Sequence, residues 1–102
     1  MNINQLTYDI SLLNNVKAKY LSLVNHLNNS IIMLEPMGGR ISSIYTVDES
    51  STPISFRCDV LVSRIRNVVN DISNTVLPAI DDAINYKKYL IEIEQANMMN
   101  AY

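Results

Sequence analysis

Histidine and cysteine, which often act as base and nucleophile in catalysis, each occur once in this sequence, as His26 and Cys58. A catalytic thiol needs a base beside it and a third group that orients the base. No motif pairs His26 with Cys58, and a lone cysteine on an apolar helix face is more often a small buried hydrophobe. We therefore expect no enzyme and no catalytic residue.

Carboxylates gather near the C-terminal end as Asp81, Asp82, Glu92 and Glu94. Paired carboxylates can bind a metal ion or act as acid and base. Helical bundles that hold two metals use Glu-x-x-His repeats, which are missing from this sequence. One cysteine is also too few for a cysteine-based zinc site or an internal disulfide. We expect a solvated acidic face, with no metal and no other cofactor.

The charge balance excludes a second class of protein. Lys plus Arg number 8 and Asp plus Glu number 10, which gives a formal net charge of -2. A nucleic-acid binder held by phosphate neutralisation carries a strong positive excess, so we expect no nucleic-acid partner. Arg57 and Arg64 share one helix face by their spacing, and we expect such residues to form ion pairs at a surface or an interface.

Apolar runs are short throughout the chain, as in residues 31–34. A membrane-spanning helix needs about twenty apolar residues in succession, so no stable membrane insertion is expected. The N-terminal residues lack the basic region and apolar core of a signal peptide. We expect the protein to be cytoplasmic when it is made.

Residues 3–34 carry a seven-residue apolar repeat that predicts an amphipathic helix. Nine of the ten positions on the seam are apolar or aromatic, and Lys17 is the exception. Val16 and Leu23 lie beside the seam and widen it, which suits a helix with more than one neighbour. The seam consists of Ile3, Leu6, Ile10, Leu13, Lys17, Tyr20, Val24, Leu27, Ile31 and Leu34.

Residues 35–53 are expected to connect two helices and reverse the chain. Pro36 ends helical patterns, and the segment Met37, Gly38 and Gly39 reads as a turn motif. Residues 40–45 could form one short turn of helix, and residues 48–53 are polar and turn-like.

Residues 54–98 carry the second helical pattern. Its seam runs through Cys58, Leu61, Ile65, Val68 and Ile72. A proline inside a helix removes a backbone hydrogen bond, so we expect a kink or a break between Asn74 and Pro78. Beyond that point a stripe on helical spacing resumes, made of Ala79, Ala83, Tyr86, Leu90 and Ile93.

These elements predict an all-α fold, a single antiparallel two-helix hairpin over residues 1–102. Each helix of a hairpin buries one stripe, and these stripes are wider than that. We therefore expect pairing into a four-helix or coiled-coil assembly, such as a dimer. The predicted partner-binding residues are Leu6, Ile10, Leu13, Tyr20, Val24, Leu27, Ile65, Ile72, Tyr86, Tyr89 and Leu90.

The chain resembles the Trp-x-Gly (WXG) family of type VII secretion. Met37, Gly38 and Gly39 stand at the place of the family's motif, where Gly39 matches its glycine and Met37 replaces its tryptophan. The family's Tyr-x-x-x-Asp/Glu signal is altered too, since Tyr86 and Tyr89 are followed four residues later by Leu90 and Ile93. The chain looks most like the small helical partners of LXG-type toxins, which resemble WXG hairpins and often lack these motifs.

The resemblance implies a non-enzymatic targeting factor that binds the helical N-terminal domain of a toxin, or a WXG-like hairpin, or itself. It also implies a route of export alongside the partner without a cleaved signal peptide. Two other functions stay open. One is a structural or chaperone hairpin of a phage or of another secretion system. The other is a small helical immunity protein that blocks a toxin.

Overall fold

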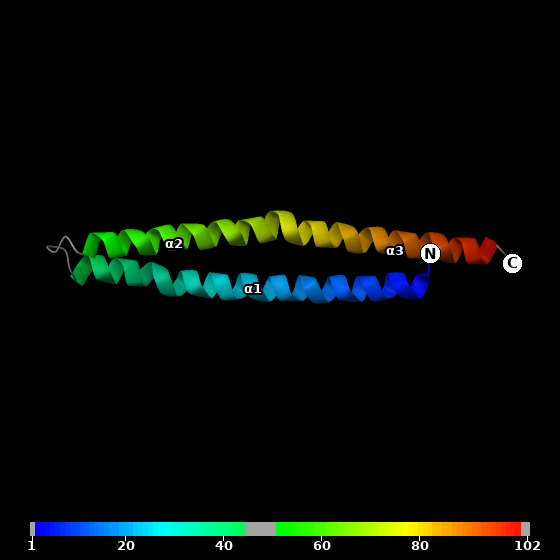
Figure 1. The fold of residues 1–102 in the computed structure, drawn as a ribbon, viewed down its shortest axis with the longest axis horizontal. Coiled ribbons are helices and arrows are strands. Elements are labelled where there is room, and N and C mark those ends of the chain that lie inside the picture. The colour runs from blue at the N-terminus through cyan, green and yellow to red at the C-terminus, as the bar shows by residue number, and fades with distance from the viewer. Residues whose placement is uncertain (1, 45–50, 101–102) are drawn as a thin grey trace. The chain divides into compact units, whose positions relative to one another are not determined.

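The structure is a computed structural model that describes residues 2–44 and 51–100 (Figure 1). Helix α1 spans Ile3–Ile44, α2 spans Ser51–Asp71 and α3 spans Leu77–Asn100. A π-helical turn, Ile72–Val76, lies between α2 and α3. The described residues contain no strand. The predicted fold class is confirmed as an all-α helical hairpin.

Helix α1 begins at a side-chain cap. The backbone N–H of Asn4 donates a hydrogen bond to Oδ1 of Asn2 at 2.9 Å. The N–H of Leu6 reaches the carbonyl oxygen of Asn2 at 3.1 Å, which closes the first turn. Asn2 is therefore the N-cap, a position where asparagine is strongly preferred.

The end of α1 differs from the sequence-based expectation. The helix was expected to stop at Leu34, with a connector over 35–53, but α1 continues through Pro36, Gly38 and Gly39 to Ile44. Helix α2 likewise begins at Ser51 rather than at residue 54. The connector is therefore shorter than expected, and the predicted turn of Met37, Gly38 and Gly39 is helical.

The physical reason lies in the pairing of α1 with α2. Arg66 of α2 forms an ion pair with Glu35 of α1, so the two helices run side by side at that level. Helix α2 extends from Arg66 back to Ser51, and α1 continues beyond Glu35 to Ile44 beside it (Figure 1). The φ angle of proline is compatible with a helix, and glycine can adopt a helical φ. Proline costs about 3 kcal/mol inside a helix and glycine about 1 kcal/mol, so both residues destabilise this part of α1 but do not prevent it from forming.

The chain divides into two compact units. Unit 1 comprises Met1–Leu21 with Ser73–Tyr102, and unit 2 is Ser22–Ile72. In each unit a part of α1 lies antiparallel to a returning helix, α3 in unit 1 and α2 in unit 2. In unit 1 Leu6 and Ile84 are buried, and in unit 2 Ile31, Val62 and Ile72 are buried.

The expected interruption before Pro78 takes the form of the π-helical turn. Pro78 is the second residue of α3 and directly follows the π-helical turn, so the residue that lacks a backbone N–H lies where the α-helical hydrogen-bond pattern is already interrupted. A π-helical turn holds one residue more than an α-helical turn needs. The backbone therefore stays helical across the proline.

The extra residue changes which side chains of α3 face inward. Val62 of α2 and Ile84 of α3 are both buried, and they are 22 positions apart, three heptads plus one residue. The inner positions therefore move by one residue from α2 to α3. Consequently Ile84 is buried, whereas the expected stripe includes Tyr86, which is exposed.

Candidate functional site

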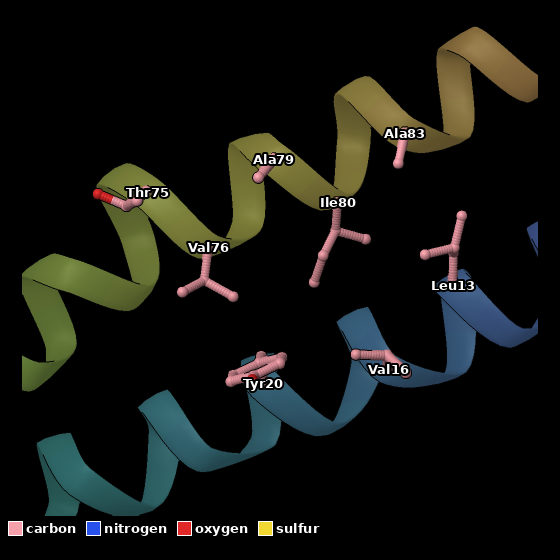
Figure 2. A pocket seen from close by; sticks show the side chains of 8 residues that line it. All are labelled: Leu13, Val16, Tyr20, Thr75, Val76, Ala79, Ile80 and Ala83. Carbon is pink, nitrogen blue, oxygen red and sulfur yellow. The ribbon is translucent and has the colours of Figure 1, made fainter.

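An apolar groove of about 440 Å³ lies between α1 and α3 in unit 1. Figure 2 shows Val76 and Ile80 of the upper helix pointing toward α1, where Tyr20 and Val16 lie across from them. Seven of the eight lining residues carry an aliphatic or aromatic side chain. The lining consists of Leu13, Val16, Tyr20, Thr75, Val76, Ala79, Ile80 and Ala83.

Small side chains explain why there is a groove at this place. Thr75, Ala79 and Ala83 follow one another at intervals of four residues, so they share one helix face. Such short side chains leave space beside α1 that leucine or isoleucine would fill. The π-helical turn supplies Thr75 and Val76, so the shift of one residue brings this small-residue face to the groove.

Two ion pairs join α1 to α3 on either side of Leu13 in the sequence. Nζ of Lys17 lies 2.7 Å from Oδ1 of Asp81, and Nζ of Lys87 lies 3.2 Å from Oδ2 of Asp9. The pairs fix the register of the two helices. Lys17, the one charged residue on the predicted seam, thus has a defined partner.

The carboxyl group of Asp9 has a second donor. Nε2 of Gln5 donates a hydrogen bond to Oδ1 of Asp9 at 2.9 Å. The hydrogen bond from Gln5, together with the hydrogen bond and charge of Lys87, lowers the pKa of Asp9 below its usual 3.8. Since the nearby charges are engaged with each other and none lines the groove, its surface is uncharged.

The predicted partner-binding residues are divided between the two units. Of these, Leu13 and Tyr20 line the groove. Leu6 and Ile72 are buried inside their own units, and Tyr86 and Tyr89 are exposed. The other predicted partner-binding residues are half-buried. They are Ile10 and Leu90 in unit 1, and Val24, Leu27 and Ile65 in unit 2.

Sequence reasoning did not select the residues that α3 contributes to the groove. The stripe expected from the sequence includes Ala79 and Ala83 but not Ile80, and none of the three is a predicted partner-binding residue. Pro78 is the feature of the sequence that could have indicated these residues. A proline that interrupts an apolar repeat can shift which positions face inward beyond it, so the repeat before Pro78 need not continue unchanged after it.

The residues with nucleophile or base chemistry are far apart. His26 is exposed on α1, and Cys58 is a half-buried free thiol on α2. The register set by Glu35 and Arg66 places Cys58 beyond Glu35 and His26 before it. At about 1.5 Å per residue, the two levels are about 25 Å apart.

Within the described ranges, no group of three or more histidine, cysteine, aspartate or glutamate side chains is placed to hold a metal ion. None of the helices in the described part of the chain has the length and apolar character to cross a membrane. Comparisons with protein-family models, curated proteins and solved structures find no match.

Proposed function

We propose that this chain is a non-enzymatic helical binding protein that receives an apolar helix of a partner in the groove of unit 1. We further propose that the partner is the helical N-terminal domain of a toxin exported by type VII secretion. The chain would then be a targeting factor for that toxin.

The observation that supports binding is the amount of apolar surface left exposed. Among the described residues, five hydrophobic side chains are buried and no large side chain is fully buried. Exposed large apolar groups of this number mark surfaces that bind other proteins. Those in the described residues are Tyr8, Leu12, Val16, Leu21, Leu23, Ile32, Met33, Met37, Leu61, Val68, Tyr86, Tyr89, Ile93, Met98 and Met99.

The groove suits a helix better than a small polar ligand. Ala79 and Ala83 allow a second backbone to approach α3 closely, while Leu13, Val16 and Tyr20 supply apolar contacts along one side. An amphipathic helix binds such a groove through apolar side chains three and four residues apart. A charged segment would lose hydration there and gain no ion pair.

The choice of partner rests on the resemblance to small helical partners of LXG-type toxins. This choice of partner does not depend on a turn motif at Met37, Gly38 and Gly39, because these residues are helical and belong to α1. A structural or chaperone hairpin and a small immunity protein remain the competing functions, and no observation in the described residues favours either of them.

Capture of the tagged protein from its native host, with mass spectrometry of the bound proteins, tests the partner. The proposal expects a larger protein with a helical N-terminal domain and a toxin-like C-terminal domain, bound through the N-terminal part. Binding through the toxic domain would instead identify an immunity protein. Recovery of unrelated machinery would support the structural hairpin.

A matched pair of variants tests the groove with the purified partner. Ala79→Glu places a carboxylate in the groove at an exposed position, and Asn85→Glu adds the same charge elsewhere on α3. We expect Ala79→Glu to weaken binding at least tenfold while Asn85→Glu leaves it unchanged. Equal affinities for the two variants would place the partner outside the groove.

A further inference from the structure

We propose that α2 carries a second binding surface, which receives an acidic amphipathic helix of another protein. This surface, the arginine seam, consists of Arg57, Leu61, Arg64 and Val68. The occupant places aliphatic side chains against the leucine and the valine, and carboxylates against the two arginines. The inference lies wholly within unit 2 and does not depend on what the groove of unit 1 binds.

The arginine seam has the spacing of a coiled-coil contact. Its four residues follow one another at intervals of four, three and four, so they form one row along α2. Arginine and an aliphatic residue alternate in the row, and each kind recurs after seven residues. One long helix packs along another through rows of this spacing, so the seam fits a helix as its partner.

The seam is exposed beside the contact between α2 and α1. Leu61 and Val68 are each 46% exposed, and the two arginines are exposed as well. The inner side chains of α2 differ from those of the seam, since Val62 is buried and Ile65 is half-buried. A second helix can therefore pack on α2 while α2 stays packed on α1.

The two arginines of the seam have no ionic partner among the described residues. Arg66 forms an ion pair with Glu35 across the two helices of unit 2. Neither Arg57 nor Arg64 forms an ion pair with any residue that the structure describes. The ion pairs that the sequence led us to expect of these arginines are therefore left for a partner.

Charge complementarity selects an acidic helix as the occupant. A guanidinium group binds a carboxylate through two parallel hydrogen bonds, so one carboxylate suits Arg57 and another suits Arg64. A basic helix would place like charges opposite each other and would be rejected. Asp71 is exposed three residues beyond Val68, so the row turns acidic only at the last residue of α2.

A protein helix fits the seam better than an anionic membrane surface. A helix that binds such a membrane combines a broad apolar face with a clear excess of basic residues. Helix α2 carries three arginines against the two aspartates Asp59 and Asp71, and the seam is a single row of side chains. The apolar part of the seam is therefore narrow and its charge excess is small.

Synthetic helices test the seam by fluorescence anisotropy with the full-length protein. Two peptides of about three heptads are used, with alanine and glutamine at the remaining positions. One repeats Glu-x-x-x-Leu-x-x, which matches the seam in a parallel orientation, and the other repeats Leu-x-x-x-Glu-x-x, which matches it antiparallel. We expect one of them to bind the wild type. The variant with Arg57→Glu and Arg64→Glu should bind that peptide about tenfold more weakly or worse, and should prefer the same peptide with lysine in place of glutamate.

The variant with Lys19→Glu and Lys88→Glu is the matched control, because both lysines are exposed in unit 1 and the net charge changes equally. It should bind the acidic peptide as the wild type does, and so should Ala79→Glu, which alters the groove. Circular dichroism should show equal helicity for all variants.

Three results would overturn the proposal. The first is the failure of both acidic peptides to bind the wild type. The second is equal affinity of the arginine variant and the lysine control for the acidic peptide. The third is binding of the wild type to phosphatidylserine vesicles, lost in the arginine variant, without binding of the acidic peptides. None of these results would change the capture of a partner by the groove, which Ala79→Glu tests separately.

Discussion

The two units use the same helix α1 in different ways. Unit 2 buries Ile31, Val62 and Ile72, whereas unit 1 buries Leu6 and Ile84 and places small residues along much of α3. Lys17 with Asp81 and Lys87 with Asp9 join the helices of unit 1, and Glu35 with Arg66 joins those of unit 2. The comparison indicates that α1 and α3 of unit 1 make fewer apolar contacts with each other, which leaves the groove open. Their ion pairs keep the two helices in register.

A single inserted residue should disturb unit 1 most. An alanine inserted after Asn74 would rotate the inner face of α3 by about 100° against α2. Leu77 and Ile84 would then lose burial, at a cost of about 3–6 kcal/mol. Deletion of Asn74 should be tolerated, because it returns the π-helical turn to an α-helical one. Urea unfolding of both variants measures the difference, and equal stabilities would show that the register of α3 is not fixed by α2.

Removing one buried side chain from each unit should show whether the units unfold separately. Ile84→Ala should cost about 2–4 kcal/mol, since it removes part of the small core of unit 1. Hydrogen exchange should accelerate in α3 more than in α2. Val62→Ala is the reciprocal variant and should accelerate exchange in α2 more than in α3. Uniform acceleration by either variant would mean that the two units unfold as one.

The cap of α1 should have a smaller effect, confined to unit 1. Asn2→Ala removes the side-chain acceptor of the Asn4 N–H and should cost about 1 kcal/mol. Faster exchange is expected in the first turns of α1, with no change around Ile31. Asn2→Asp keeps an acceptor oxygen and should retain nearly all of the stability measured by thermal unfolding.

Acid should weaken unit 1 slightly through Asp9. Its pKa is lower in the folded protein than its usual 3.8, so the stabilisation is present above that value and is lost as the pH falls through the folded pKa. Asp9→Asn should therefore lower the thermal stability slightly near neutral pH, where the ionised carboxylate is stabilising, and should reduce the further loss of stability below pH 3.8. Equal acid sensitivity in wild type and variant would show that Asp9 does not contribute.

The sequence pattern predicted the elements better than their ends. The seven-residue repeat from Ile3 to Leu34 correctly indicated α1, because burial of an apolar face follows directly from its spacing. The same reasoning placed the end of the helix at Pro36, where the local penalty is real but small beside the pairing with α2. Among the residues that line the groove, the predicted partner-binding set includes Leu13 and Tyr20 but none from α3, because the inner positions of α3 shift by one residue beyond the π-helical turn.

By itself, the sequence determined the all-α class, the apolar seam of α1 and the interruption at Pro78, since local spacing and proline geometry act within a few residues. The tertiary structure decided how far α1 extends, which face of α3 turns inward and which lysines meet which carboxylates. These outcomes depend on contacts between segments far apart in the chain, such as Glu35 with Arg66 and Asp9 with Lys87. Local preferences of about 1–3 kcal/mol yield to such contacts when many of them act together.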